Sequence, residues 1–142
     1  MPANNNPIFT TAPDIQWAPV AVAAANTAKD GTGTVATVYT ATPSGSSGNG
    51  SFVTKLTARP AGTNVATVLR VFVNNGGANA TAANNIMIAE MTLPATTLSE
   101  VAAQAEFSLP LNLALPAGYT IFCTLGTAVA AGYYLSVMGG KY

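Results

Sequence analysis

The segment FSLPLNLAL (residues 107–115) carries the clearest strand signal of the sequence. Large apolar residues occupy every second position, at Phe107, Leu109, Leu111, Leu113 and Leu115. A period of two places all five side chains on one face of a β-strand. Pro110 falls on the opposite face and lacks a backbone donor, so this strand is expected to run at a sheet edge or to contain a bulge.

The same signals recur on both sides of this segment. Runs rich in Val, Ile, Thr and aromatic residues, each bounded by Gly, Pro, Asn or Ser, predict eight strands at residues 15–24, 35–41, 51–59, 65–74, 86–93, 105–115, 119–124 and 133–138. The nearest approach to a helix is TLSEVAAQ (97–104), where one turn capped by Ser99 is expected. The sequence therefore predicts an all-β, antiparallel two-sheet sandwich with a jelly-roll-like layout.

The chain length and the positions of proline predict the domain organisation. A chain of 142 residues is long enough to bury one proper core. The first 13 residues, MPANNNPIFTTAP, are polar and interrupted by proline, so we expect an extended N-terminal arm over 1–13 and a single sandwich domain over 14–142. We also expect the arm to contact a neighbouring molecule through Ile8 and Phe9.

Composition narrows the classes of partner. Charged residues make up 7% of the chain, against about 25% in an ordinary soluble domain, and five acids balance five bases. Nothing in this balance attracts nucleic acid or anionic lipid, and no apolar run approaches the roughly 20 residues of a membrane helix. A protein with so few charged residues is expected to be bound to copies of itself or to a partner. A neutral soluble monomer is the alternative.

The residues that usually carry catalysis are scarce. The chain has no His, and its one cysteine, Cys123, sits in the apolar run YTIFCTL, which predicts a buried and inert thiol. Glu90 and Glu106 could be neighbours on paired strands and cleave a glycosidic bond, but solvent-facing charges explain them as well. We therefore predict no enzyme, no catalytic residue, no cofactor and no metal site.

Two runs of small polar residues are read as loops. SGSSGNGS (44–51) lacks the Lys and the following Ser or Thr of a phosphate-binding loop, so a hairpin loop is expected. NNGGANATAANN (74–85) predicts a second long loop, either mobile or ordered by a partner.

Some apolar positions exceed what one core needs. The strand at 65–74 is apolar on both faces, so the face turned away from the core would expose Val68 and Phe72 unless another subunit covers them. Trp17, beside Pro19, is interpreted as a core or interface anchor. The alternative is a sugar-stacking platform built from Trp17 and the tyrosines.

Five segments spread over the chain carry a recognisable pattern: NTAKDGTGTVATVYTA (26–41), GTNVATVLRVFVNNG (62–76), AEMTLPATTLSE (89–100), LNLALPAGYTIFCTLGT (111–127) and GYYLSVMGGKY (132–142). Together they resemble the small structural proteins of tailed bacteriophages and prophages. Among these, the chain is most similar to capsid decoration, or cement, proteins with a jelly-roll body. The resemblance is one of pattern, and no diagnostic motif carries family binding residues over to positions in this chain.

The resemblance implies a non-enzymatic role on the outer capsid surface of a virion. Such a protein binds the phage major capsid protein, commonly as a homotrimer, and stabilises the shell by bridging its subunits. It would be made in the cytoplasm of the host bacterium. For the interface we predict the large side chains and one charged residue, which are Trp17, Arg70, Phe72, Phe122 and Tyr134, in addition to Ile8 and Phe9.

Two other functions use the same fold. A tail-fibre or receptor-binding head would present loop-clustered aromatic residues to a host glycan. A subunit of a bacterial surface or storage assembly would need only contact surface.

Overall fold

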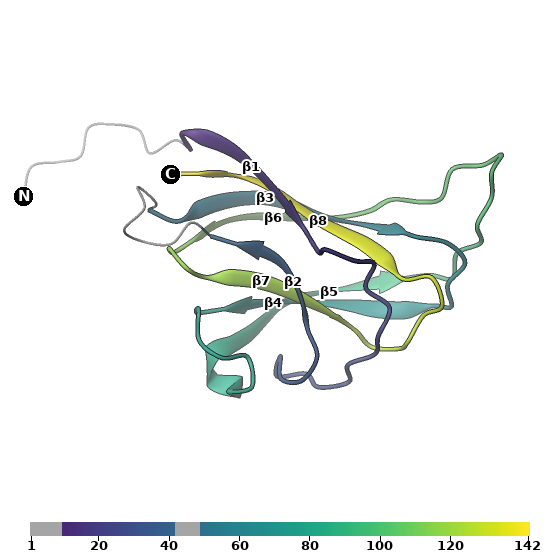
Figure 1. Ribbon diagram of the computed structural model, residues 1–142, viewed down its shortest axis with the longest axis horizontal. Helices are drawn as coiled ribbons and strands as arrows, with labels where there is room; N and C mark the ends of the chain where they lie inside the picture. The colour runs from purple at the N-terminus through teal and green to yellow at the C-terminus, as the bar shows by residue number, and fades with distance from the viewer. Residues whose placement is uncertain (1–9, 42–48) are drawn as a thin grey trace, which may run out of the picture.

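The eight predicted strands are present, and their alternating side chains explain them. The computed structural model of the chain describes residues 10–41 and 49–142 (Figure 1). Along β6 the burial of successive side chains alternates, as the period of two predicts. The strands are β1 (Ala12–Trp17), β2 (Ala36–Thr40), β3 (Ser51–Pro60), β4 (Thr67–Asn74), β5 (Asn85–Leu93), β6 (Phe107–Leu115), β7 (Thr120–Leu125) and β8 (Tyr133–Lys141).

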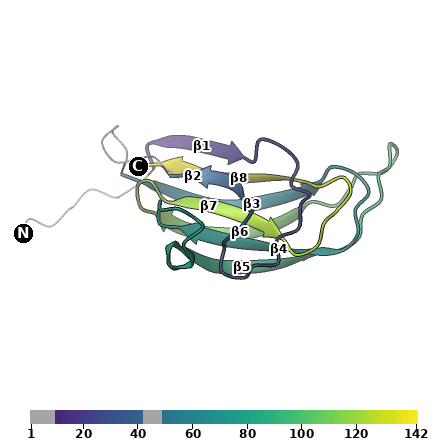
Figure 2. The same ribbon diagram turned by 60° about the horizontal axis from the view of Figure 1, so that its bottom comes forward.

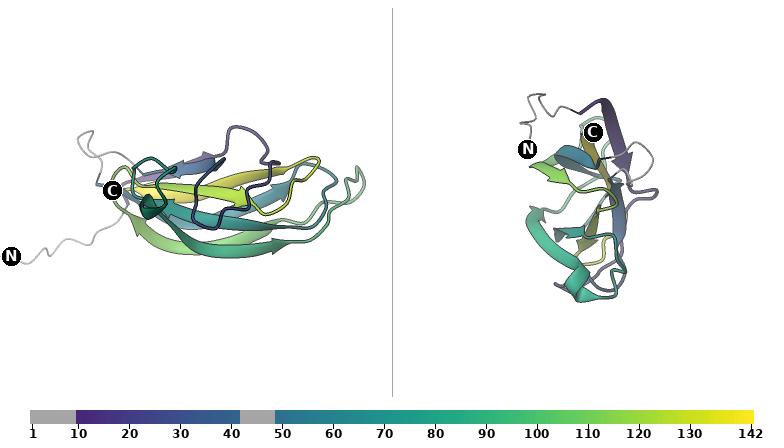
Figure 3. Two further views of the ribbon diagram at one scale, coloured as in Figure 1. Left: turned by 90° about the horizontal axis from the view of Figure 1, so that it is seen from below. Right: turned by 90° about the vertical axis from the view of Figure 1, so that its left-hand side faces the viewer.

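The strands form two antiparallel four-stranded sheets that pack face to face, as the end-on view shows (Figure 3). One sheet has the order β1-β8-β3-β6 and the other β2-β7-β4-β5. Strand β1 pairs with β8, β2 with β7, β3 with β6 and β4 with β5. These nested pairs are those of one long hairpin rolled up on itself, which is the jelly-roll connectivity. The predicted fold class is confirmed.

The core lies between the two sheets. Its fully buried side chains come from the inward positions of both sheets and include Tyr39, Leu56, Leu69, Leu93, Ile121, Leu125, Tyr133 and Leu135. The five large residues of β6 all pack against this cluster. Cys123 is part of the core, so the predicted burial of its thiol is confirmed, and burial raises the pKa of that thiol.

Strand β6 lies at the edge of its sheet, where Pro110 costs no hydrogen bond to a second neighbour. The register with β3 also shifts here, because Val53 pairs with Leu113 and Lys55 with Pro110. Asn112, in this irregular stretch, has a φ of 48°. Both expectations for Pro110, an edge position and a bulge, are therefore met.

Two predicted boundaries were wrong at the N-terminal end. Strand β1 begins at Ala12, inside the predicted arm, because Ala12 and Pro13 pair with Lys141 and Gly140. It ends at Trp17, whereas residues 18–24, predicted as strand, form a crossing segment that holds only isolated bridges. Of these residues only Ala18 is buried, and Val22 alone forms a bridge, to Tyr133.

The helical turn predicted at residues 97–104 is absent. Ser99 nonetheless accepts hydrogen bonds from the backbone N–H of Val101 (3.2 Å) and Ala102 (3.1 Å), the bonds of a helix cap. The described residues contain no α-helix, and one turn of 3-10 helix, η1 (Ala82–Asn84), lies in the β4–β5 connection.

Candidate interaction face

Exposed apolar side chains gather on the outer face of the sheet β1-β8-β3-β6. Trp17 is 66% exposed, Tyr134 60% and Ile15 55%. The register brings them together, because Ile15 pairs with Met138 and Trp17 with Ser136 on β8, two residues from Tyr134. Diagonal neighbours on one face of a sheet lie about 7–8 Å apart. We call this surface, formed by Ile15, Trp17, Tyr134 and Met138, the open face.

Alternation along β8 turns these side chains outward. Tyr133, Leu135 and Val137 are buried in the core, so Tyr134, Ser136 and Met138 must point to the other side of the sheet. Because β8 is flanked by β1 and β3, its outward side chains stand in the middle of the open face. The sheet thereby supports the open face on a regular scaffold.

A shallow groove of about 220 Å³ crosses the open face. Trp17 and Tyr134 line it together with Thr57 and Ser136, whose hydroxyl oxygens are hydrogen bonded at 2.6 Å. Arg59, which pairs with Tyr134 in the sheet, forms an ion pair with Glu106, and both residues also line the groove. We call this feature the aromatic groove, since two exposed aromatic rings flank a floor of hydroxyls.

A hydrogen-bond network ties β1, which carries Trp17, to the opposite sheet. The Tyr39 hydroxyl donates to the Asp14 carboxylate (2.7 Å), and the Gln16 amide donates to the same carboxylate (2.9 Å) and to the Thr40 carbonyl (2.9 Å). The Thr40 N–H donates back to Gln16 Oε1 (2.9 Å). Burial, together with the Asp14 carboxylate, raises the pKa of Tyr39 to about 12. The edge strand β1 is thus held against β2 at its middle, next to the open face.

Of the predicted interface residues, the structure brings Trp17 and Tyr134 together on the open face. Ile8 and Phe9 lie outside the described residues. Sequence reasoning missed Ile15 and Met138, although Ile15 stands two residues before Trp17 and so shares its face in a strand.

Phe72 and Phe122 were predicted as interface residues, and the structure contradicts this. They face outward from β4 and β7, but both are buried and their rings stack at 5.2 Å. The cover is the connection between β1 and β2, which crosses in front of β4 and β5 in Figure 2. A Cβ on Gly31 in this connection would lie 3.0 Å from the Phe122 ring. The chain itself therefore covers the surface that the sequence left for a partner.

Arg70 is likewise engaged within the chain. Its guanidinium pairs with Glu90 at 2.9 Å and donates to the Asn26 carbonyl at 3.3 Å, and its side chain is only 12% exposed. Arg70 therefore links β4, β5 and the connection between β1 and β2, and it is not part of the open face.

Asparagine side chains hold the covering connection in place. Asn85 Nδ2 donates to the carbonyls of Asp30 (3.1 Å) and Asn79 (2.8 Å), and Asn79 Nδ2 donates to the Gly33 carbonyl (2.9 Å). Asn74 donates to Asn85 Oδ1 (2.8 Å). The loop at 74–85 is thus held by hydrogen bonds within its own chain.

The proposed carboxylate pair is not formed. Glu90 lies on β5 of one sheet and Glu106 immediately precedes β6 of the other, and each pairs with its own arginine. In the described parts of the chain, no three His, Cys, Asp or Glu side chains come close enough to hold a metal ion.

Within residues 10–41 and 49–142 there is no helix with the length and apolarity to span a membrane. Comparisons of the chain with protein-family models, curated proteins and solved structures gave no match.

Proposed function

We propose that the protein is a non-enzymatic structural protein of a virion that decorates an icosahedral phage capsid through the open face. The observation that carries the proposal is the gathering of Ile15, Trp17 and Tyr134, each more than half exposed, on one regular sheet face. Contiguous apolar surface on a small domain marks an interaction site, and Trp and Tyr dominate the energetics of such contacts. Contact surface is what a decorating protein needs.

The electrostatics of the chain agree with a partner found by shape and apolar contact. The formal net charge is zero, and the ion pair beside the open face joins two residues of the same chain. Neither feature creates a field that would steer a charged partner from a distance. In the proposal, the partners are the major capsid protein and further copies of this chain in a homotrimer, and the site of action is the outer capsid surface.

Copy number per particle tests the proposal. Particles induced from the host that carries this gene are purified and analysed by quantitative mass spectrometry. A number close to that of the major shell protein supports decoration. A handful of copies indicates a tail or vertex component, and absence of the protein from the particles overturns the proposal.

A matched pair of variants tests the surface. Ile15 on the open face and Ile86 on β5 have similar exposures of 55% and 63%. In a binding assay with particles that lack the protein, Ile15→Ser is expected to weaken attachment, whereas Ile86→Ser leaves it unchanged. Equal effects of the two variants would move the contact surface away from the open face.

A second candidate function, glycan recognition by a tail-fibre or receptor-binding head, is favoured by the aromatic groove. Exposed Trp17 and Tyr134 offer rings against which a sugar can stack, while Ser136, Thr57 and the Arg59–Glu106 pair offer hydrogen bonds. Jelly rolls occur in both capsid and lectin domains, so the fold alone does not separate the two functions. Saturable binding on a glycan array, lost in Tyr134→Ala, would favour recognition over decoration.

A further inference from the structure

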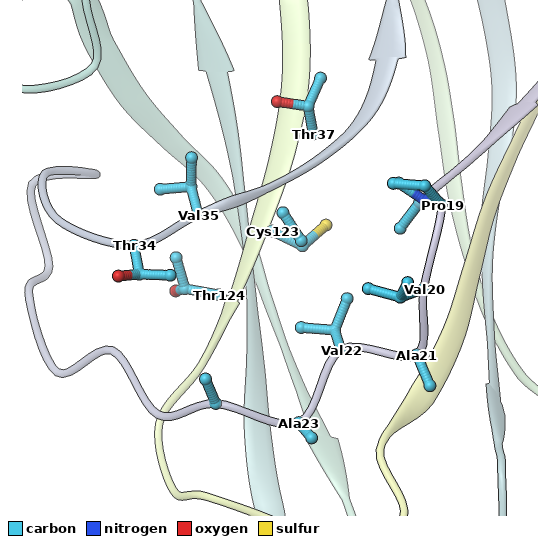
Figure 4. A pocket seen from close by; sticks show the side chains of 13 residues that line it. Pro19, Val20, Ala21, Val22, Ala23, Thr34, Val35, Thr37, Cys123 and Thr124 are labelled. Carbon is cyan, nitrogen blue, oxygen red and sulfur yellow. The ribbon is translucent and has the colours of Figure 1, made fainter.

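A second hollow lies on the other side of β1, at the edge where the two sheets meet. After Trp17 the chain runs through residues 18–24 and then crosses the outside of the second sheet. It returns at residues 34–37, where β2 begins at Ala36 (Figure 4). Between these two segments and β7 is a cavity of about 590 Å³, open on one side. We call it the edge cavity. Its lining residues are Ala18, Pro19, Val20, Ala21, Val22, Ala23, Ala24, Thr34, Val35, Ala36, Thr37, Cys123 and Thr124.

The edge cavity occupies a gap in strand pairing. Strand β2 pairs with β7 only as far as Ala36 and Cys123, and the next contact on that side of β7 is the bridge between Ala25 and Leu125. Thr124 lies between these two points, so on this side of β7 no described strand pairs with it, although β4 pairs with it on the other side. The edge of β7 is therefore lined by the two diverging segments and not by a continuous sheet.

We call residues 18–24 the first wall of the edge cavity and residues 34–37 its second wall. Backbone hydrogen bonds fix the first wall and the residues that follow it. Ala18 N–H donates to the Leu135 carbonyl (3.0 Å), Val22 and Tyr133 exchange two bonds of 2.9 Å, and Asn26 N–H donates to the Leu125 carbonyl (2.7 Å). The second wall is fixed by the pairing of Ala36 with Cys123 and by a bond from Asn26 Nδ2 to the Thr34 carbonyl (2.7 Å). Both walls are thus anchored, and the cavity is preformed, as ligand sites usually are.

Most of the surface that lines the edge cavity is aliphatic. Five alanines leave space that larger side chains would fill, and no lining residue carries a charge. Figure 4 shows valines from both walls and the Cys123 side chain from β7 around the opening. A hollow lined mostly by apolar side chains with a few polar groups is the usual form of a small-molecule site.

Three threonines, Thr34, Thr37 and Thr124, supply the polar groups of the lining. The Thr124 hydroxyl oxygen is buried with almost no accessible surface, so it does not offer a hydrogen bond to a molecule in the edge cavity. The lining therefore gives a ligand little polar contact.

From these observations we infer that the edge cavity binds an uncharged, mainly aliphatic molecule of the size of a medium-chain alcohol. An ionised carboxylate does not fit, because no cation lines the cavity to offset its loss of water. The inference does not depend on the proposed function, since the edge cavity shares only Ala18 with the aromatic groove.

The test is an NMR titration of the full chain, labelled with ¹⁵N, with octanol and in parallel with octanoate at neutral pH. Saturable shifts of the amides of Val22, Ala36 and Cys123 are expected with octanol only. Shifts that do not saturate, or octanoate binding as tightly as octanol, would overturn the inference.

Variants locate the site. Ala36→Leu fills the edge cavity and is expected to weaken octanol binding at least tenfold, whereas Ala114→Leu, on the exposed side of β6, leaves it unchanged. Ala24→Leu, at an exposed position that also lines the edge cavity, is a second filling variant and is expected to weaken octanol binding as well. Octanol affinity that is unchanged in a folded filling variant contradicts the inference. If Ala36→Leu does not fold, Ala24→Leu decides.

Discussion

Phe72 and Phe122 pair directly across β4 and β7, with ring centroids 5.2 Å apart and an angle of 16° between the ring planes. Both rings lie on the outward side of their sheet, and both are buried. The molecule therefore has a small second core outside the sandwich, between this sheet and the connection from β1 to β2. This arrangement explains why the outer side of β4 and β7 is covered around the two rings, while the other sheet keeps its open face.

The second core is expected to contribute to stability as a true core does. Phe72→Ala should lower the free energy of unfolding by about 3–5 kcal/mol, the cost of removing a buried aromatic ring. Chemical denaturation measures the change. Tyr134→Ala, which removes an exposed ring on the open face, is the control and should change stability by less than about 1 kcal/mol. Similar losses in the two variants would contradict the assignment of Phe72 to a core.

The close approach of Gly31 to this core gives a second prediction. Gly31 and Gly118 have nearly equal φ values of 78° and 80°, so alanine at either position carries the same backbone cost of about 1–2 kcal/mol. An added Cβ at Gly31 would stand 2.8 Å from Asn85 Cβ and 3.0 Å from the Phe122 ring, whereas at Gly118 it meets nothing within 4 Å. Gly31→Ala should therefore be clearly less stable than Gly118→Ala in thermal unfolding. Equal melting temperatures would show that the covering connection is not packed on Phe122.

Asn64 is the buried polar centre at the end of the sandwich where β8 begins. Its Oδ1 accepts from the N–H groups of Ala131 and Gly132, both at 2.9 Å, and its Nδ2 donates to the Gly132 carbonyl at 2.9 Å. Asn64→Ala should cost about 1–3 kcal/mol for each donor left without a partner.

Asn64→Asp retains an acceptor for the two N–H groups but places a carboxylate against the Gly132 carbonyl. This variant therefore separates the effect of the accepted hydrogen bonds from that of the donated one. Asn75→Ala, at an exposed position, is the control for loss of an amide. Urea denaturation of the three variants checks the order, with Asn75→Ala the most stable. An Asn64→Ala variant as stable as Asn75→Ala would rule out the role given to Asn64.

The raised pKa of Tyr39 predicts how stability changes in alkali. Its folded pKa of about 12 lies above the value of about 10 expected in the unfolded chain. The contribution of neutral Tyr39 is therefore complete below pH about 10 and is lost as the pH rises toward 12. Burial raises the pKa of Tyr133 as well, which adds to the same decline.

Unfolding followed between pH 8 and 12 checks this dependence on Tyr39. Tyr39→Phe loses a hydrogen bond to a carboxylate, worth about 1.5–3 kcal/mol, and should show a shallower decline in alkali. Tyr134→Phe should keep the slope of the unaltered chain, because Tyr134 is exposed. A slope that Tyr39→Phe does not reduce would assign the alkaline decline to other groups.

Local patterns located the strands well because each pattern is a property of neighbouring residues. The alternation of leucines along β6 needs no information from the rest of the chain. The same holds for Pro110, whose missing donor restricts it to an edge or a bulge wherever the strand lies. Residues 18–24 were misjudged because a run of alanine and valine suits a strand and a connecting segment at the sheet edge equally.

The candidate site was predicted only in part. Trp17 and Tyr134 could be singled out as large residues, but 117 positions separate them in the chain, and only the pairing of β1 with β8 makes them neighbours. Phe72 was misplaced because alternation tells which residues face away from the core and not what lies over them. The cover depends on the part of the connection at residues 26–35, NTAKDGTGTV, which is mostly small and polar and carries no apolar stripe.

By itself, the sequence determined an all-β sandwich of eight strands, a nearly neutral surface, a buried thiol and the scarcity of groups for catalysis. These follow from composition and from the two-residue period of a strand, which are local properties. The tertiary structure decided which sheet face stays open, which one is partly covered by the connection between β1 and β2, and where small side chains leave the edge cavity. Each of these depends on contacts between residues distant in the chain, and such contacts are set by strand pairing and packing, not by local pattern.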